Sequence, residues 1–471
     1  MLRIFRHYLP ASALLLFVCD ATVIVSVFFV ATRILASTQP MLPDIAQRHT
    51  TAIIFAGLFS TVLFHVVGLY SKWLITDFAR AMPRLVVCFA LAAPFIVVFW
   101  LVQLPNPGGV ADTNQAMIYL SWTGFAFAGV SLWRAVFAAL VRATKTPYRV
   151  LVVGTGKLAA QIEDFISQDK HTNTTIVGYT SLCDEKVLVP KRRLRPLKAP
   201  EGCLLSIARQ ESVKEIVVAL DDRRGVPLRM LLDARMEGIR ITSYRSFWER
   251  ETRRVNLGAL DPSWLIYSDG FQTNSELNVV LKRLLDVSAS LALLIFMAPL
   301  LLFCAIAIRA SSPGPILYRQ TRIGRNGAEF TIYKFRTMRV DAESDGIPQW
   351  ATLRDPRVTS IGAFLRAMRI DELPQIINVL RGDMSFVGPR PERPFFVESL
   401  LKEVPFYSER HRVRPGITGW AQINYPYGAS IEDAKAKLSF DLYYIKNYSF
   451  IFDILIILAT ARAILSNRGG R

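Results

Sequence analysis

Between Leu284 and Ile308 the chain reads LLDVSASLALLIFMAPLLLFCAIAI, and how this apolar run meets a membrane determines where everything after it lies. The run is long enough to cross the roughly 30 Å hydrocarbon core of a bilayer as a helix. Pro299 lies inside it, where a proline removes a backbone hydrogen bond and bends a helix. Both flanks are basic, with Lys282 and Arg283 before the run and Arg309 after it. Because positive charge marks the cytoplasmic side, the run predicts a re-entrant membrane helix over about 284–308, broken at Pro299.

The composition also indicates a membrane protein. The chain has 471 residues, 52% of them apolar, and a mean hydropathy of +0.30. It nevertheless carries 56 Lys and Arg against 38 Asp and Glu, a formal net charge of +18. The high apolar content excludes a disordered chain, and few soluble proteins combine it with this much positive charge. We therefore expect basic residues that face the phosphate of lipid or ligand, with nucleic acid as the competing partner.

Four further apolar segments occupy the first third of the chain, at about 11–31, 51–69, 85–104 and 116–140. Each is near the roughly 20 residues that span a bilayer as a helix. Lys and Arg gather before the first segment, between the second and third and after the fourth, whereas the loop 104–115 has none. The positive-inside rule thus predicts a four-helix transmembrane region, residues 1–145, with both its ends in the cytoplasm. Asp20 and His65 lie within these segments, and we favour pairing between helices over a functional role for them.

Residues 146–272 alternate short apolar runs with polar helical stretches, which is typical of a parallel sheet covered by helices. RVLVVGTG predicts a strand that runs into a glycine turn, and Gly154, Gly156 and Ala159 resemble a dinucleotide-binding turn. The acidic residue expected at the end of the second strand is missing, because Asp184 comes several residues late. We predict a small, degenerate Rossmann-like α/β middle domain, and we prefer a structural or regulatory module over a nucleotide-binding one.

Residues 273–471 are basic and rich in motifs, and their pattern predicts a mainly α-helical cytoplasmic domain after the re-entrant helix. In FTIYKFR, alternation places Lys334 and Arg336 on one face of a strand. A helical pattern that carries Arg366 leads to the adjacent acids Asp371 and Glu372, which we expect at the start of a new helix. The final apolar run, 450–465, is short and interrupted by an aspartate, so it is expected to lie on the membrane surface as an amphipathic helix.

Two adjacent acids among arginines and a lysine suit phosphoryl chemistry. Guanidinium groups bind phosphate oxygens in pairs, and two turns, GDMSFVGPRP and RPGITGWAQ, add Arg390 and Arg414. One carboxylate could bind Mg²⁺ together with substrate phosphates, and the other could attack phosphorus. The alternative interpretation is that Asp371 and Glu372 cap a helix while the arginines bind lipid headgroups. From these residues alone both interpretations stay open.

Five motifs in order, YRQTRIGRNG, YKFRTM, DELPQ, GDMSFVGPRP and RPGITGWAQ, closely resemble the bacterial sugar transferase family. Its members are polyprenyl-phosphate sugar-1-phosphate transferases, which start exopolysaccharide or O-antigen assembly. The resemblance covers about residues 278–465, and the four predicted spans with a degenerate nucleotide fold resemble the long form of the family. The stretch DPSWLIYSDGF, residues 261–271, is similar to the exopolysaccharide-locus branch.

The resemblance implies roles for single residues. Asp371 of DELPQ matches the family's nucleophile and Glu372 matches its Mg²⁺ ligand. Lys334 and Arg366 match positions near the substrate phosphates, and Arg390 of GPRP matches a uridine-diphosphate contact. The remaining candidates for binding substrate phosphate or UDP are Arg336, Arg414 and Asp441. In one respect this chain departs from short members, whose helix break is often Ser-Pro; here it is Ala298-Pro299, which keeps the proline without the hydroxyl.

The expected reaction begins when Asp371 attacks the β-phosphorus of a UDP-sugar, which releases UMP and leaves a sugar phosphate on the enzyme. Polyprenyl (undecaprenyl) phosphate then takes up the sugar-1-phosphate. The resemblance places such an enzyme in the bacterial inner membrane as a multi-pass protein, with the catalytic domain on the cytoplasmic face. The sequence leaves the sugar and the pathway open, and it leaves a homodimer open as well.

Two other functions compete with this one. A membrane-bound NAD-dependent sugar-nucleotide dehydratase or epimerase would normally need a Tyr-x-x-x-Lys pair, which the sequence lacks. A non-catalytic assembly scaffold would use the acid pair only structurally and would release no UMP. We expect no nucleic-acid partner, because the basic motifs adjoin an apolar hairpin and include no recognition helix or aromatic stacking module.

Overall fold

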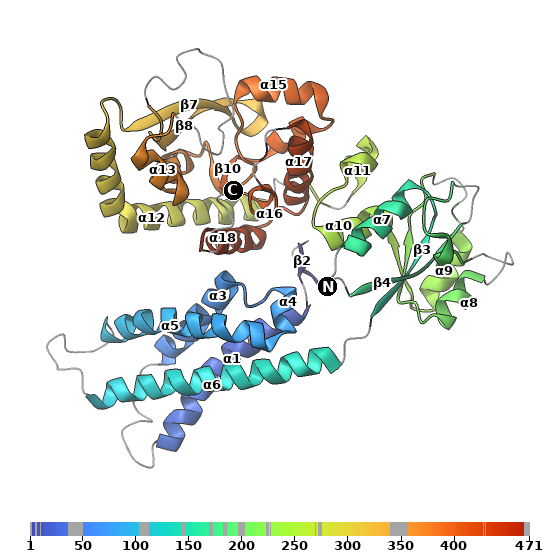
Figure 1. Cartoon of the computed structure of the whole chain (residues 1–471), viewed down its shortest axis with the longest axis horizontal. Helices are drawn as coiled ribbons and strands as arrows, with labels where there is room; N and C mark the ends of the chain where they lie inside the picture. Colours follow the sequence, from blue (N-terminus) through green and yellow to red (C-terminus); the bar gives the residue numbers. More distant parts are fainter. Residues whose placement is uncertain are drawn as a thin grey trace. The chain divides into compact units, whose positions relative to one another are not determined.

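The computed structural model describes residues 2–4, 7–9, 11–35, 50–102, 113–143, 147–168, 173–181, 186–195, 203–222, 226, 228–268, 270–271, 276–339, 357–426, 428 and 430–465. The chain forms two compact units, which meet in sequence between Glu251 and Thr252 (Figure 1). Two short strands, β1 (Leu2–Ile4) and β2 (His7–Leu9), pair near the N-terminus. Asp184 and most of the loop 104–115 lie outside the described residues.

Long helices occupy the four apolar segments of the N-terminal region: α1 (Ala11–Leu35), α3 (Thr50–Val67), α5 (Phe78–Val102) and α6 (Thr113–Ala143), with the short α4 (Lys72–Ile75) before α5. Phe64, Leu85 and Val130 belong to one buried core between them, whereas Leu15 and Leu132 are exposed. By length and composition, two helices in the described part of the chain could cross a membrane, over Trp122–Ala143 and Glu276–Ser311. The four-span arrangement therefore stays a prediction.

A buried polar contact joins the first and last of these helices. The carboxylate of Asp20 accepts a hydrogen bond from Nη2 of Arg134 at 2.6 Å and one from the hydroxyl of Tyr70 at 2.9 Å. Arg134 also donates to the carbonyl of Leu69 at 3.3 Å. The predicted pairing between helices is confirmed for Asp20, while the ring of His65 lies 6.0 Å from that of Tyr70.

The middle domain contains a four-stranded parallel sheet in the order β4-β3-β5-β6, which confirms the predicted α/β fold. Its strands are β3 (Tyr148–Val153), β4 (Thr174–Thr180), β5 (Glu215–Val218) and β6 (Arg240–Ser243). Figure 1 shows α7 (Lys157–Gln168) on one side of the sheet and α8 (Cys203–Gln210) and α9 (Leu228–Met236) on the other. A short 3-10 turn, η1 (Lys191–Arg193), and a further helix, α10 (Tyr244–Thr252), complete this part of the chain.

The middle domain ends earlier than the predicted range 146–272, because residues from Thr252 onward belong to the C-terminal unit. Val255 is buried in the core of the C-terminal unit, and the partly buried Trp264 packs against that core. The indole of Trp420 donates to the carbonyl of Arg253 at 2.9 Å. The 3-10 turn η2 (Leu257–Ala259) and the short helix α11 (Pro262–Tyr267) form in this stretch. The sequence pattern indicated local structure here but not which core its apolar side chains join.

The C-terminal unit is mainly helical, as predicted. It contains the antiparallel strands β7 (Leu317–Ile323) and β8 (Glu329–Phe335), joined through η3 (Arg325–Gly327), and the short parallel pair β9 (Ser385–Val387) and β10 (Gly416–Thr418). Its helical elements are α12 (Glu276–Ser311), α13 (Ser360–Ala367), η4 (Ile370–Gln375), α14 (Ile376–Arg381), α15 (Pro394–Glu403), η5 (Tyr407–Arg412), α16 (Trp420–Asn424), α17 (Ile431–Lys446) and α18 (Phe450–Leu465).

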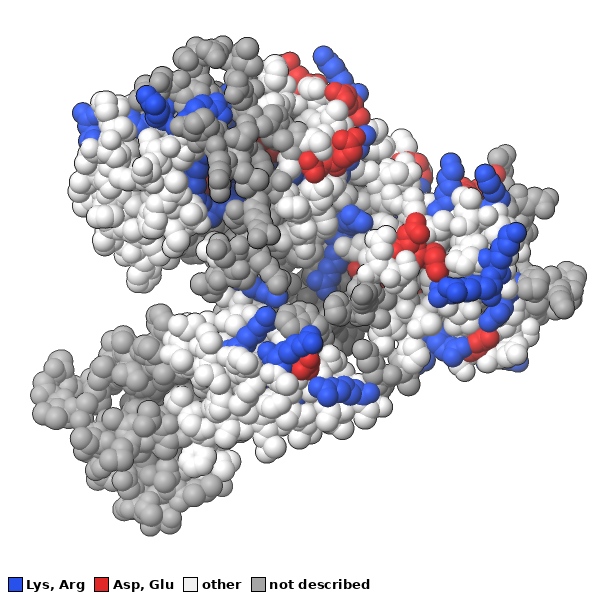
Figure 2. Space-filling model, viewed as in Figure 1, with Lys and Arg blue, Asp and Glu red and all other residues white. Residues whose placement is uncertain are grey.

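Helix α12 carries Pro299 within its 36 residues, and Figure 1 shows it turning sharply part-way along its length. Both halves contact the same unit. Near its start, Arg283 donates to the carbonyls of Val379 and Leu380, at 2.6 and 2.7 Å. Near its end, Cys304 and Ile308 pack in a cluster that includes Leu365 of α13. Figure 2 shows the surface over α12 as largely uncharged; its exposed side chains include Ile295, Phe296 and Phe303.

The tail helix α18 packs into the core of the C-terminal unit through Phe452 and Ile456. Asp453, which interrupts its apolar run, is 1% exposed and accepts a hydrogen bond from Nζ of Lys282 at 2.5 Å. Lys282 also donates to the carbonyl of Val387 at 2.9 Å. The charged side chain of Asp453 therefore holds α18 against α12. The prediction of an amphipathic surface helix did not include this contact.

Candidate active site

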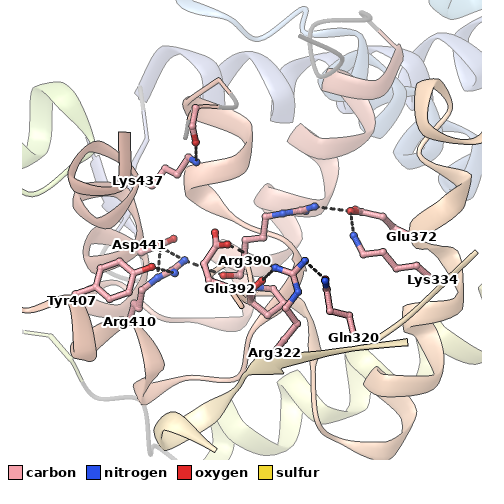
Figure 3. A network of polar contacts seen from close by, with 12 residues as sticks. Gln320, Arg322, Lys334, Glu372, Arg390, Glu392, Tyr407, Arg410, Lys437 and Asp441 are labelled. Carbon is pink, nitrogen blue, oxygen red and sulfur yellow. Dashed lines mark hydrogen bonds and ion pairs between the residues drawn. The ribbon is translucent and has the colours of Figure 1, made fainter. Parts of the chain in front are cut away.

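Three segments distant in sequence meet at Glu372. Its Oε1 accepts a hydrogen bond from Nζ of Lys334 at 2.9 Å and one from Nη2 of Arg390 at 2.7 Å (Figure 3). Lys334 belongs to β8, Glu372 to η4, and Arg390 to the loop that follows β9. Sequence reasoning named all three as site residues, and the structure brings them together.

The backbone around Lys334 is held in place by Asn378 of α14, which is fully buried. Its side-chain oxygen accepts a hydrogen bond from the amide of Tyr333 at 3.1 Å, and its Nδ2 donates to the carbonyl of Thr331 at 2.7 Å. The planar side-chain amide of Asn378 thus accepts one hydrogen bond from β8 and donates another to it. Together they fix the register and the direction of β8 against the segment that carries the acids. The lysine therefore reaches Glu372 from a rigid strand.

Asp371 lies beside Glu372 in the first turn of η4 and is 9% exposed. Among the residues that the structure describes, its carboxylate has no hydrogen-bond or ion-pair partner. Burial, followed by the negative charge of Glu372, raises the pKa of Asp371 above its ordinary value, against the opposing effect of Lys334 and the nearby arginines. A carboxylate without a hydrogen-bonded partner is the better nucleophile of the two.

Glu372 has the opposite behaviour. Burial alone would raise its pKa, but the charges of Arg390 and Lys334 and their hydrogen bonds hold the pKa of Glu372 well below its ordinary value. Neighbouring acids whose pKa values are pushed apart are typical of active sites, where they take different roles. Here Glu372 stays ionised and paired, while the predicted role of Asp371 as nucleophile stays a prediction.

Arg366 of α13 approaches the same acids. Its Nε donates to the hydroxyl of Thr337 at 2.9 Å, and its charge lowers the pKa of Asp371. Gly362, one turn earlier, lies directly against the backbone of Thr337, because a Cβ there would come within 2.0 Å of the Thr337 carbonyl oxygen. This close approach keeps α13, and with it Arg366, beside the end of β8.

A second group of cations lies next to Arg390. Arg322 of β7 donates to Oε1 of Gln320 at 2.6 Å and to the carbonyl of Pro391 at 3.1 Å (Figure 3). Its Nε is buried and has no hydrogen-bond partner among the residues that the structure describes. Burial, opposed in part by Glu392, and repulsion from Arg390 and a neighbouring arginine lower the pKa of Arg322. Positive charge that is incompletely paired in a buried site favours binding of an anion.

Asp441 reaches the site through Arg410. Its Oδ2 accepts a hydrogen bond from Nε of Arg410 at 3.1 Å and forms an ion pair with Nη2 of Arg410 at 2.9 Å, and this pair is almost fully buried. Arg410 in turn donates to the carbonyl of Arg390 at 3.0 Å and to the hydroxyl of Tyr407 at 2.7 Å. Asp441 and Arg410 thus position the loop that carries Arg390; a direct substrate contact by Asp441 stays a prediction.

One predicted phosphate contact, Arg336, makes hydrogen bonds within the fold. Arg336 follows the end of β8, and its guanidinium donates to the carbonyls of Ser312 and Pro313, at 2.8 and 3.0 Å, which fixes the end of α12 to this strand. Arg414 precedes β10, its charge opposes the rise in the pKa of Tyr448, and its contact with substrate phosphate stays a prediction. Sequence reasoning did not name Arg410, Gln320 or Tyr407 as site residues, because nothing in their spacing shows which long side chains meet.

The acid pair fits a Mg²⁺ ion that also binds substrate phosphate. No three His, Cys, Asp or Glu side chains gather as a metal site in the described part of the chain. Mg²⁺, however, commonly takes only one or two carboxylates and completes its shell with phosphate and water. Oε2 of Glu372 makes no hydrogen bond or ion pair with the described residues, so it is available for such an ion.

Comparison with known proteins extends these observations. The family model described as "Bacterial sugar transferase" matches residues 277–467, and one described as "CoA-binding domain" matches residues 65–234. The chain is 41% identical over 251 residues to a UDP-N-acetylgalactosamine-undecaprenyl-phosphate N-acetylgalactosaminephosphotransferase of Aeromonas hydrophila. That alignment covers 53% of this chain and 58% of the relative, so it spans little more than half of each protein.

A second relative matches over nearly its whole length. This is the UDP-glucose:undecaprenyl-phosphate glucose-1-phosphate transferase of Xanthomonas campestris pv. campestris, 30% identical over 490 aligned residues, which cover 99% of this chain and 96% of the relative. The exopolysaccharide production protein PSS of Rhizobium leguminosarum bv. phaseoli is 44% identical over 200 residues, 41% of this chain and 100% of that protein. The acid pair with its lysine and arginines lies within the matched region, and the chain belongs to the bacterial sugar transferase family.

Proposed function

We propose that the protein transfers a sugar-1-phosphate from a UDP-sugar to undecaprenyl phosphate and releases UMP, as the first step in building a lipid-linked glycan such as an exopolysaccharide. The observation that carries the proposal is the acid pair: Glu372 is held by Lys334 and Arg390, while Asp371 beside it is buried and unpaired among the described residues. The names of the relatives support the same substrates. They differ in the sugar, so a panel of UDP-sugars is the appropriate assay.

The reaction proceeds in two displacements at one phosphorus atom. A carboxylate oxygen of Asp371 attacks the β-phosphorus of the UDP-sugar, the bond from that phosphorus to the bridging oxygen breaks, and UMP leaves with the bond's electrons. An oxygen of undecaprenyl phosphate then attacks the same phosphorus and releases the Asp371 carboxylate. The product is a diphosphate-linked lipid sugar. Lys334, Arg366 and Arg390 stabilise the charge on the phosphoryl oxygens.

Mg²⁺ is part of the proposal. Glu372 would hold it through the oxygen that Lys334 and Arg390 leave available. When bound, the ion neutralises phosphate charge and lowers the barrier to attack by an anion. Addition of excess EDTA should stop UMP release, and Mg²⁺ should restore it.

The membrane arrangement is proposed as well: four N-terminal spans and a re-entrant α12 in the bacterial inner membrane, with the acid pair on the cytoplasmic side. The two helices long and apolar enough to cross a membrane support it, as do the membership of the family and the apolar exposed surface of α12. The bend in α12 and its contacts with one unit at both ends favour re-entry over a straight span.

The first test replaces the nucleophile. Asp371→Asn keeps the size of the side chain and removes its charge, so it should reduce UMP release from a UDP-sugar by at least about 10³-fold. UMP is measured with membranes, undecaprenyl phosphate and Mg²⁺. Glu398→Gln, an exposed acid of α15, is the matched control and should retain activity. Normal turnover by Asp371→Asn would refute the mechanism, and an inactive wild-type protein with every UDP-sugar would favour a scaffold.

A further inference from the structure

The turn between β3 and α7 in the middle domain is the place where a Rossmann-like fold binds the phosphates of CoA or a dinucleotide. Phosphates bind there because the first amides of the helix point at the ligand and the helix dipole favours negative charge. Here the turn contains Gly154, with φ of +128°, and Gly156, and α7 begins at Lys157. The match to a CoA-binding family model makes this turn the expected phosphate site.

The amides at the start of α7 are already occupied by a side chain of the same domain. Asp221 follows β5, and its Oδ2 accepts a hydrogen bond from the amide of Lys157 at 2.8 Å. Its Oδ1 accepts one from the amide of Leu158 at 3.0 Å. Both oxygens of one carboxylate therefore take the positions that two phosphate oxygens would take. The negative charge also lies where the helix dipole favours it.

The glycine of the turn confirms how closely this carboxylate fits. A Cβ built on Gly156 would lie 2.3 Å from Oδ2 of Asp221, so the space that normally lets a phosphate approach the backbone holds the aspartate instead. The backbone of the turn is engaged as well, since the amide of Leu188 donates to the carbonyl of Thr155 at 2.8 Å. The residues present do not fit a phosphate at this turn.

We infer that Asp221 is an internal substitute for the phosphate and that the middle domain binds neither CoA nor a dinucleotide at this turn. A ligand phosphate would have to displace a carboxylate from two hydrogen bonds and come close to its charge. The domain then acts without such a cofactor, and its nucleotide fold is retained as a structural module. Removing the carboxylate should turn the closed turn into an anion site.

The first experiment uses the unmodified full-length protein in nanodiscs. Amide hydrogen exchange is followed in a peptide that covers residues 154–160, with and without 1 mM CoA or NAD⁺ (about 1 mM exceeds the Kd of ordinary cofactor sites). The expected result is no change in exchange, because Asp221 already protects these amides. Protection of this peptide by either ligand would overturn the inference.

The second experiment opens the turn. Asp221→Ser should bind pyrophosphate at least about fivefold more tightly than the wild-type protein, since an N-terminal carboxylate cap typically contributes about 1 kcal/mol. Asp222→Ser, the neighbouring acid, is the matched control and should bind as the wild type does. Adding Gly156→Ala to Asp221→Ser should abolish the gain, which assigns it to the turn. An unchanged affinity in a folded Asp221→Ser protein would contradict the inference. If Asp221→Ser does not fold, the milder variant Asp221→Asn is measured in its place.

Discussion

Asp371 and Glu372 are adjacent in the chain, but their surroundings separate their pKa values. As the pH falls, Asp371 takes up a proton first, because burial and the charge of Glu372 raise its pKa, while Glu372 stays ionised against Lys334 and Arg390. Since only the anion attacks phosphorus, activity should fall as the pH decreases through the raised pKa of Asp371. The acid limb of the pH–rate profile for UMP release therefore reports this residue.

Lys334→Met tests this assignment. Lys334 lowers the pKa of Asp371, so removing its charge should raise that pKa further and move the acid limb to higher pH, by roughly one unit for a close charge pair in a buried site. The rate of UMP release is measured across pH with saturating UDP-sugar and Mg²⁺. Lys402→Met, an exposed lysine of α15, should leave the limb in place. A limb that stays, or moves to lower pH, in Lys334→Met would mean that another group controls it.

For single residues, the sequence predicted which residue types form the site better than it predicted which side chains contact one another. The acids and three of their cations, Lys334, Arg366 and Arg390, could be named from motifs, because residue types and order carry that information. The contacts of Arg336 could not be predicted. Arg336 comes one residue after the end of β8, and its long side chain turns to the end of α12. Asp441 meets Arg410 across two elements, and no spacing in the sequence shows which arginine a buried acid will pair with.

Among the elements, α12 is the proposed membrane contact of the unit that carries the acid pair. Without a bend, a helix of 36 residues would be about 54 Å long and could span a bilayer. Pro299 supplies the bend, and packing of Cys304 and Ile308 against α13 brings the second half back to the same unit that Arg283 holds at the first half. In the proposed arrangement, this bend would let α12 carry apolar surface into the membrane without moving its end to the other side.

Removing the proline should weaken this return. In Pro299→Ala the helix regains a backbone donor, so part of the protein should have the end of α12 on the opposite side of the membrane. The parent protein for this test has its five native cysteines replaced and carries Ser311→Cys. This single cysteine is labelled with an impermeant maleimide in sealed vesicles of known orientation. The parent should be labelled from the cytoplasmic side only. Pro313→Ala, a proline just outside the helix, should behave as the parent does; labelling from the outside in the parent would contradict re-entry.

The element pattern was predictable wherever periodicity or apolar length is strong. The apolar segments, the alternating middle domain and the helical last part all appear close to their expected places. The stretch from Thr252 to Phe271 was assigned to the wrong unit, because a local pattern does not reveal which core an apolar side chain such as Trp264 will join. The parallel pairing of β9 with β10 was also beyond the sequence, since a helix and further turns separate the two strands.

For the whole molecule, the distribution of charge and apolar residues predicts an orientation in the membrane. The net charge is +18, and Lys and Arg gather both at the predicted cytoplasmic ends of the predicted spans and around Glu372, where Lys334 and Arg390 are proposed to bind phosphate. If both sets face the cytoplasm, the anionic inner leaflet and the anionic substrates attract the same side of the protein. The buried pair of Asp20 and Arg134 fits this arrangement, because it joins α1 to α6 within the core of the N-terminal helices.

This orientation makes opposite predictions for two surface positions. Gly109, in the predicted loop without Lys or Arg, should face the periplasm, whereas Lys402 of α15 should face the cytoplasm. Each is replaced by cysteine in the protein without its own cysteines, and impermeant maleimide is added to intact spheroplasts. Gly109→Cys should be labelled at once and Lys402→Cys only after lysis, with UMP release retained in both. Labelling of Lys402→Cys in intact cells would place the acid pair on the side that lacks UDP-sugars, and the four-span topology would then be wrong even if the phosphoryl chemistry is right.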